Sequence, residues 1–431
     1  MNAQHDSKLQ QYSSTISQKD IAILIPTMNR PQFLGRALAY YRTTGFDGYI
    51  CIGDSSSEEL VQQNIAFIRS ASEDLNILYR YFPPTKFHND SHCLKKLIDI
   101  APARYLVYSG DDDLLVPAGL LECAIFLSQH PDYSAVHGVR AYVKLNAAGA
   151  YGAIIDSDFI FEHILENDSP HRRLAGYLLN ANSTQYYVHR KETWQKMYEQ
   201  VSSIELRYIG PELLPCSLSA VLGKIGLVKC LTTVFQINEE RVFSWQTNSL
   251  FELMLSPEWP SAISVVRTSI MQAILMSEDV RTSDTQSEVD ILLLMHFSEM
   301  LSWQYFKQYP DYLKHELPCV VDLIPFADNT FNLLFGNPWH NVIKWIKQLI
   351  IKELHLMNRV ATDRLVQQAA WYNVMLLYID ASKHHNLDSY DREKHSIRSS
   401  IANSYKKLLT ENRSISDQLR GIIVTAYSEK A

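Results

Sequence analysis

Short apolar runs alternate with segments of helical periodicity along the first part of the chain, and this alternation most limits the folds available to it. The run Ile21–Pro26 (Ile-Ala-Ile-Leu-Ile-Pro) has the composition of a strand buried on both faces. Similar strands are expected at Tyr49–Gly53, at Leu75–Phe82 and directly before Ser109, with helices between them. Strands that alternate with helices form a mostly parallel sheet through right-handed crossovers. The sequence therefore predicts an open α/β sheet flanked by helices.

The pattern continues less regularly to about residue 240. It predicts the following elements: a strand at Ala135–Leu145, helices near 159–166 and 170–180, a strand at Gln185–His189, a helix after Lys191, a helix near 212–222, and a last strand at Val228–Ile237.

The length of 431 residues exceeds what one compact core usually holds, so we expect more than one domain. Residues 1–19 are polar and are predicted to form a flexible leader, and residues 20–240 carry the α/β pattern. Residues 241–431 are predicted to form a helical C-terminal domain, because helical periodicity dominates there, as in Val342–Met357 and Leu365–Ile379.

Composition and charge narrow the class of protein. The net charge of −7, without a long basic run, argues against a nucleic-acid partner. The six cysteines are scattered without a Cys-x-x-Cys pair, which indicates reduced thiols rather than a zinc site or disulfides. Neither a secretory signal nor a membrane-spanning stretch is apparent, so we expect a cytoplasmic protein.

Three consecutive carboxylates follow the strand before Ser109. Asp111, Asp112 and Asp113 repel one another, and holding a divalent cation is a common use of such a cluster. The carboxyl ends of parallel strands also open onto the ligand crevice of an α/β sheet. The alternative is that the three acids favour the N-terminus of a helix beginning near Pro117.

The order of three motifs resembles a GT-A glycosyltransferase of the family 2 type over residues 20–240. Ile25–Pro31 resembles the opening strand and turn of that family, Asp54-Ser55-Ser56 its uridine-reading acidic position, and Ser109–Asp113 its metal-binding Asp-x-Asp motif. The resemblance implies a nucleotide-sugar donor, most simply a UDP-sugar, and a divalent metal, Mn²⁺ or Mg²⁺, that acts on the leaving diphosphate.

The resemblance also implies roles for individual residues. Asp113 would bind the metal directly, Asp111 would touch the ribose or sugar and share the metal, and Asp112 would lie beside the donor. Asp54 would contact the uracil edge, or else cap the helix that begins near Glu58. The following two residues would line the first turn: Thr27, and Arg30, which pairs either with phosphate or with a surface acid.

An inverting transferase needs a carboxylate that accepts the proton of the acceptor hydroxyl. Glu212, in Gly210-Pro211-Glu212, resembles the first acid of the family's Glu-Asp helix start, although Leu213 replaces the second acid. A favourable contact with the helix dipole is the alternative. The reserve candidates are Asp156 and Asp158, in the expected loop after Tyr151–Ile155. Weaker donor contacts, Lys86 and His88, are more simply interpreted as solvated loop residues.

The first hypothesis is thus a metal-dependent, inverting glycosyltransferase that acts on a hydroxyl of a glycan, lipid-linked glycan or protein in surface-polysaccharide synthesis. Peripheral contact with the inner face of the membrane, through segments such as Trp345–Leu356, and homo-oligomer formation both stay open. The second hypothesis is an inactive nucleotide-binding scaffold, favoured by the missing second acid. A nucleotidyltransferase is a third, but the first turn lacks the glycine-rich loop such enzymes carry.

Overall fold

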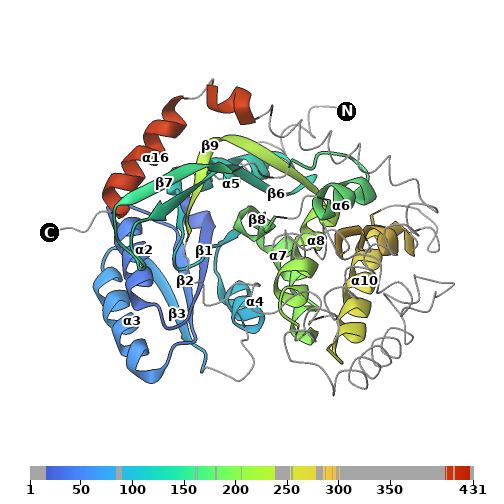
Figure 1. Ribbon diagram of the computed structural model, residues 1–431, viewed down its shortest axis with the longest axis horizontal. Coiled ribbons are helices and arrows are strands. Elements are labelled where there is room, and N and C mark those ends of the chain that lie inside the picture. Colours follow the sequence, from blue (N-terminus) through green and yellow to red (C-terminus); the bar gives the residue numbers. More distant parts are fainter. Residues whose placement is uncertain are drawn as a thin grey trace, which may run out of the picture.

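The computed structural model of the chain describes residues 16–83, 90–160, 164–179, 182–204, 206–237, 256–277 and 413–427, together with Glu162 and parts of 253–300 and 403–410. Within these residues, nine strands form one curved sheet with helices packed on both of its faces (Figure 1). The strand order is β3-β2-β1-β4-β8-β6-β9-β5, and β7 pairs with β6 outside this path. The α/β class and the open sheet flanked by helices are confirmed.

The first half of the sheet is parallel, as the alternation of elements predicts. β1 pairs in parallel with β2 and β4, and β2 pairs in parallel with β3. Their bounds are β1 Ile21–Thr27, β2 Tyr49–Asp54, β3 Asn76–Tyr81 and β4 Tyr105–Tyr108. The connecting helices are α2 Pro31–Thr43, α3 Glu58–Ala71 and α4 Asp90–Ile100. Pro31 begins α2 because its fixed φ suits the first turn, and Gly45, at φ +64°, ends the segment in the left-handed region.

The second half of the sheet is mixed. The antiparallel pairs are β4 with β8, β8 with β6, β6 with β7, and β9 with β5, while β6 and β9 run parallel. Their bounds are β5 Leu114–Leu115, β6 Tyr133–Leu145, β7 Ile154–Ile160, β8 Val188–Arg190 and β9 Lys224–Ile237. β6 and β9 approach closely at Gly138, where a Cβ would lie 2.2 Å from the carbonyl oxygen of Cys230. This glycine lets the two longest strands bend together.

Each face of the sheet has its own apolar core, which explains why the first strand is continuously hydrophobic. Ile21, Ile23 and Ile25 point into one core, and Ala22 and Leu24 point into the other. The isoleucines share their core with buried residues of α2, α5 (Pro117–Gln129) and the C-terminal helix α16 (Arg413–Ala426). A strand buried on both faces therefore leaves only its carboxyl end for polar groups.

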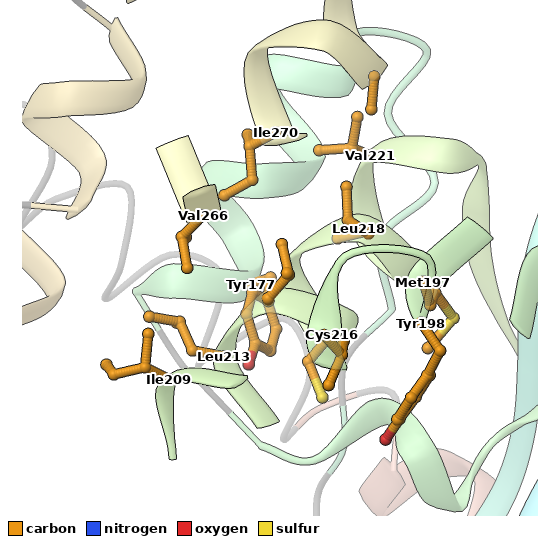
Figure 2. Close-up of a cluster of buried hydrophobic side chains, with 14 of the residues drawn as sticks. Tyr177, Met197, Tyr198, Ile209, Leu213, Cys216, Leu218, Val221, Val266 and Ile270 are labelled. Atoms are coloured by element: carbon orange, nitrogen blue, oxygen red, sulfur yellow. The ribbon is translucent and has the colours of Figure 1, made fainter. Parts of the chain in front are cut away.

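A cluster of helices covers the other face (Figure 2). Four helices meet there, and each contributes a buried side chain to the cluster: Tyr177, Met197, Leu218 and Val266. The bounds of these helices are α6 Pro170–Leu178, α7 Lys191–Met197, α8 Leu214–Leu222 and α10 Trp259–Leu275. The guanidinium of Arg173 donates to the carbonyl oxygens of Ala220 and Val221, at 2.8 Å each, and so caps the last turn of α8.

Two predicted elements are wrong. The helix near 159–166 is absent, because β7 occupies Ile154–Ile160 and pairs with β6 alone. Its polar residues face solvent at the margin of the sheet, so the strand lacks the apolar alternation that the sequence pattern relies on. The strand expected at Gln185–His189 begins later: a 3₁₀ turn, η3, spans Thr184–Tyr186 before β8.

The described helices of the C-terminal region pack on the α/β part of the chain. α10 lies against α8, and α16 lies against α2 and β9, far from α10 (Figure 1). The helical segments predicted at 342–357 and 365–379 lie outside the described residues. Among the helices that the structure describes, none has the length and apolar character needed to cross a bilayer.

Candidate active site

The three carboxylates lie in a turn at the carboxyl end of β4. We name Ser109–Asp113 the acid turn; it connects β4 to the short strand β5. Asp111 and Asp113 are each 4% exposed. The helix α5 begins only after β5, with Val116 at its N-cap and no side-chain cap. The acids therefore do not cap this helix by a side-chain hydrogen bond.

Gly110 lets the acid turn fold tightly. A Cβ at this position would lie 2.8 Å from Asp112 Oδ1 and 2.8 Å from Asp113 Oδ2. Real Cβ atoms do not approach oxygen so closely, so a larger residue at this position would push the two carboxylates out of their present places.

The carboxylate of Asp111 binds two residues from the first turn of the chain. The hydroxyl of Thr27, at the end of β1, donates to Asp111 Oδ2 at 2.7 Å. Arg30 Nη1 lies 2.9 Å from Asp111 Oδ1. Because β1 and β4 are parallel neighbours, their carboxyl ends bring these residues together, as the order of the strands predicts.

Arg30 joins two of the three acids. Besides its contact with Asp111, its Nη2 lies 2.8 Å from Asp112 Oδ2. The ring of Phe33 lies under the guanidinium, with its centroid 4.1 Å from Cζ. The Arg30 side chain keeps 19% of its surface exposed. The sequence left two kinds of partner open for Arg30, a phosphate or a surface acid. In the structure Arg30 pairs with acids, and these are the acids of the site itself.

Asp113 is held by elements from the second half of the fold. The hydroxyl of Tyr186, in η3, donates to Asp113 Oδ2 at 2.6 Å. The backbone N–H of Gln236, in β9, donates to Asp113 Oδ1 at 3.2 Å. A carboxylate that accepts bonds from two separate elements has a fixed orientation.

A second arginine, Arg36, is buried and binds the backbone of the acid turn. Arg36 is 1% exposed, and its Nη2 donates to the backbone carbonyl of Asp112 at 2.6 Å. Its Nη1 donates to the carbonyl of Ala150 at 2.6 Å and to the side-chain oxygen of Gln236. Arg36 thus connects α2, the acid turn, the β6–β7 hairpin and β9.

Tyr186 in turn rests on a buried ion pair. Arg140 Nη1 lies 2.5 Å from Glu162 Oε1, and the Tyr187 hydroxyl donates to Glu162 Oε2 at 2.6 Å. The Arg140 guanidinium covers the ring of Tyr186, with Cζ 4.7 Å from the centroid. Breaking a buried pair of this kind is costly, so the support behind Tyr186 is rigid.

The electrostatics of the acid turn favour the approach of positive charge. Burial, with the neighbouring Asp112 charge, raises the pKa of Asp113, and burial raises the pKa of Asp111 even though Arg30 opposes the shift. Burial by itself would lower the pKa of Arg30, but the Asp111 and Asp112 charges outweigh it and raise that pKa. Burial and the repulsion between the carboxylates thus oppose their ionisation, and Arg30 offsets this only in part at Asp111.

Asp54 ends β2 and is completely buried. Its Oδ1 accepts the Ser56 N–H at 2.9 Å, and its Oδ2 accepts the Asn64 side-chain amide at 2.9 Å and the Tyr79 hydroxyl at 3.1 Å. Ser57, rather than Asp54, stands at the N-cap of α3. The carboxylate therefore shapes the loop after β2, next to Thr27, with which Asp54 is in register. Its contact with a uracil stays a prediction.

Glu212 lies in a wide helical turn, η5 (Ile209–Leu213), that precedes α8 instead of opening it. The turn begins at Tyr208, whose φ of +66° is in the left-handed region. Glu212 is partly exposed, while its neighbour Leu213 is buried in the cluster of Figure 2. The Gln185 side chain donates to the Pro211 carbonyl at 2.5 Å. Adjacent residues of η3 thus contact Asp113 and the turn that carries Glu212.

The remaining candidates lie elsewhere. Asp156 and Asp158 are exposed residues of β7 and not of a loop, so the sequence placed them wrongly. Asp156 accepts the Tyr142 hydroxyl at 3.1 Å. Lys86 and His88 lie outside the described residues.

Sequence reasoning missed the residues that hold the acid turn from behind. Arg36 occupies an inward position of α2, where a charged residue breaks the apolar face, and this break is the one signal that the sequence offered. Tyr186 and Gln236 carry no motif. Their contacts with Asp113 span 73 and 123 residues of sequence.

The fit of the implied divalent metal can be judged from the donors. Carboxylate oxygens suit Mg²⁺ or Mn²⁺ chemically. In the described residues, however, no three His, Cys, Asp or Glu side chains converge as ligands, and Arg30 already binds one oxygen of Asp111 and one of Asp112. As arranged here, the acid turn fits a guanidinium rather than a metal ion.

No protein-family model matches the chain, and no curated protein matches it. Solved structures that align along the chain include residues 1–349 of S. aureus TarS, at 11% identity and a TM-score of 0.46, covering 83% of this chain and 91% of that one. The same fragment with UDP-GlcNAc aligns at 13% identity, covering 84% and 92%, with a TM-score of 0.46.

A mannosyltransferase from Pyrobaculum calidifontis, PcManGT, solved with GDP-Man and Mn²⁺, aligns at 10% identity and a TM-score of 0.34, covering 83% of this chain and 86% of that one. At such TM-scores the similarity does not bear on the activity of this chain.

Proposed function

We propose that the chain is a glycosyltransferase that moves a sugar from a nucleotide-sugar, in the first instance a UDP-sugar, to a hydroxyl acceptor in glycan or surface-polysaccharide synthesis. The observation that carries the proposal is the meeting of Thr27, Arg30, Asp54 and the acid turn at the carboxyl edge of parallel strands. Nucleotides bind at this edge in open α/β sheets. The three sequence motifs on which the resemblance rests converge there.

The donor would lie across the carboxyl ends of β1, β2 and β4. Asp54 and the loop that it shapes would face the base, Arg30 would face the diphosphate, and the acid turn would face the hydroxyls of the ribose and sugar. Arg30 is suited to the diphosphate because its planar guanidinium binds phosphate and carboxylate oxygens alike. Its partial exposure leaves it within reach of a ligand, unlike Arg36.

Glu212 would accept the proton of the attacking hydroxyl, and the sugar carbon would invert. The link through η3 supports this assignment, because Gln185 contacts the turn that carries Glu212 and Tyr186 contacts Asp113. The wide turn before α8 also leaves the carboxylate partly exposed. A divalent ion, Mn²⁺ or Mg²⁺, is implied by the resemblance, but no step is assigned to it because Arg30 holds the acids.

An inactive nucleotide-binding scaffold is the second candidate. It is favoured by Leu213, which replaces the second acid of the resembled motif and is fully buried. The two candidates share the donor site and differ only in turnover.

A donor-consumption assay separates them. Purified protein is incubated with UDP-sugars and GDP-sugars, with and without Mn²⁺, alone and with glycan and lipid-linked acceptors, and nucleoside diphosphate release is measured. The proposal predicts release from one donor, and its loss in Asp113→Asn. Donor binding without release over the whole acceptor panel would favour the scaffold.

A further inference from the structure

The C-terminal helix reaches the acid turn through one side chain. Tyr427, at the end of α16, is 1% exposed, and its ring covers the guanidinium of Arg36, with Cζ 4.6 Å from the centroid. The backbone carbonyl of Tyr427 accepts the Gly152 N–H at 3.2 Å, which ties the end of α16 to the β6–β7 hairpin. Residues almost 400 positions apart in the sequence are therefore in direct contact.

Arg36 needs this cover because of its unusual surroundings. It is a buried cation whose hydrogen bonds all go to neutral acceptors, namely two backbone carbonyls and the Gln236 amide. A buried charge without a hydrogen-bonded acid is unfavourable unless other groups stabilise it. The electron-rich face of Tyr427 is one such group, and the ring of Phe33, with its centroid 5.5 Å from Cζ, adds a more distant contact.

The consequences of moving Arg36 would fall on the acids. Arg36 Nη2 holds the carbonyl of Asp112, and Nη1 holds the side chain of Gln236. The N–H of Gln236 in turn orients Asp113. The other end of the Gln236 amide donates to the Gly149 carbonyl at 2.7 Å, so the hairpin belongs to the same network.

We propose that Tyr427 is a positioning residue of the donor site: it fixes Arg36, and through Arg36 it fixes the backbone of Asp112 and the orientation of Asp113. The inference rests on the proposed function in so far as the donor site binds a nucleoside diphosphate. It gives the C-terminal helix a part in donor binding, a role distinct from contact with an acceptor or a membrane.

The chain supplies a matched set of variants. Tyr427→Phe keeps the ring and removes a buried hydroxyl for which the described residues offer no hydrogen-bond partner. Tyr427→Leu keeps much of the apolar volume but removes the aromatic face. Leu419→Ala weakens the packing of the same helix at a buried core residue, while the hydrogen bonds and ring contacts described for Arg36 go to other residues.

Two readouts are measured on the full chain under conditions where circular dichroism shows all variants folded. The first is the Kd for UDP by calorimetry. The second is hydrogen exchange of the Gln236 amide, which bonds Asp113 and needs no ligand. Tyr427→Leu should weaken UDP binding about tenfold and speed Gln236 exchange. Tyr427→Phe and Leu419→Ala should match the wild type in both.

The outcomes distinguish this inference from the proposed function. If Tyr427→Leu leaves Gln236 exchange and the Kd unchanged, or if Leu419→Ala alters them equally, Tyr427 is an ordinary core residue and the inference is overturned. If Gln236 exchange responds only to Tyr427→Leu while the wild type binds no nucleoside diphosphate, the positioning role stands and the proposed function fails.

Discussion

Arg30 Nη1 lies 2.9 Å from Asp111 Oδ1, so a cation of the chain itself occupies the carboxylate to which the sequence motif assigns a metal ion. The same guanidinium binds Asp112 at 2.8 Å and stacks on Phe33. A divalent ion that used these oxygens of Asp111 and Asp112 would have to displace Arg30. The acid turn is therefore a place where two kinds of positive charge compete.

Removal of the Arg30 guanidinium should raise the affinity of the acid turn for a divalent metal ion. Without nucleotide, Arg30→Gln is expected to bind Mn²⁺ about tenfold more tightly than the wild type, a difference of about 1.4 kcal/mol. Arg30→Lys should fall between them, because a single ammonium cannot reach both acids in the fork geometry of arginine. Electron paramagnetic resonance of free Mn²⁺ measures all three affinities, and Asp111→Asn in each background shows whether the ion is bound here. Equal affinities for Arg30→Gln and the wild type would contradict the competition.

Glu212→Gln should separate binding from turnover. The substitution keeps the size of the side chain and removes the carboxylate that accepts a proton, so transfer should fall about 10²–10⁴-fold while the Kd for donor stays unchanged. Glu166→Gln is the control, because Glu166 is an exposed acid bonded to Tyr133. Transfer kinetics and calorimetry check both variants. Unchanged transfer in Glu212→Gln would show that another group is the base.

The Tyr186 hydroxyl, which donates to Asp113, should contribute to the free energy of unfolding. Tyr186→Phe removes a bond to a buried carboxylate, which typically contributes about 1.5–3 kcal/mol. Tyr142→Phe removes the same chemistry from Asp156 on the exposed strand β7, where the loss should be below about 0.5 kcal/mol. Urea denaturation at pH 7.5 compares the two free energies of unfolding. Equal losses would mean that Asp113 draws no special support from Tyr186.

His189 should make the fold less stable in mild acid. Its Nδ1 donates to the Tyr187 carbonyl at 2.9 Å, its Nε2 lies 2.8 Å from the Ser219 hydroxyl, and burial lowers its pKa to about 4. Between about pH 6.5 and 4 the unfolded chain binds a proton that the folded chain does not. The contribution of His189 to the free energy of unfolding is thus complete above pH 6.5. It decreases as the pH falls toward 4, by about 3 kcal/mol at most.

The pH dependence is assigned to His189 by comparison with a variant. The free energy of unfolding is measured from pH 7.5 to 4.5 for the wild type and for His189→Gln, which cannot titrate. The variant should lose less stability over this range than the wild type. Parallel curves would assign the acid sensitivity to other groups.

The parts of this fold that sequence could predict are those with a local cause. β1, β2 and β4 follow from apolar runs buried on both faces, and their parallel order brings Thr27 and Arg30 to Asp111. β7 was missed because it is a polar strand with one partner, and no local pattern distinguishes it from a loop or a short helix.

The residues that hold the acid turn in place could not be predicted from the sequence, for a different reason. Arg36, Gln236 and Tyr427 act through contacts between distant parts of the chain, and each would be unremarkable by composition alone. Likewise, the carboxylate motif suggests a metal ion, but the cation that binds Asp111 in the structure is Arg30. This ion pair depends on the register between β1 and β4, which brings the turns after the two strands together. Such pairings are set by tertiary packing and not by residue spacing.

Nucleotide binding by the acid turn is the central claim, and thermal unfolding with a panel of nucleoside diphosphates tests it most directly. Wild type and Asp111→Asn are heated with UDP, GDP, ADP and their sugars, each with Mn²⁺, with Mg²⁺ and with chelator. A ligand at about a hundred times its Kd stabilises by about 2.7 kcal/mol, which moves the midpoint by a few degrees. The account predicts such a shift for one nucleotide, UDP in the first instance, and its loss in Asp111→Asn. No shift with any nucleotide, from wild-type protein that is well folded, would contradict it.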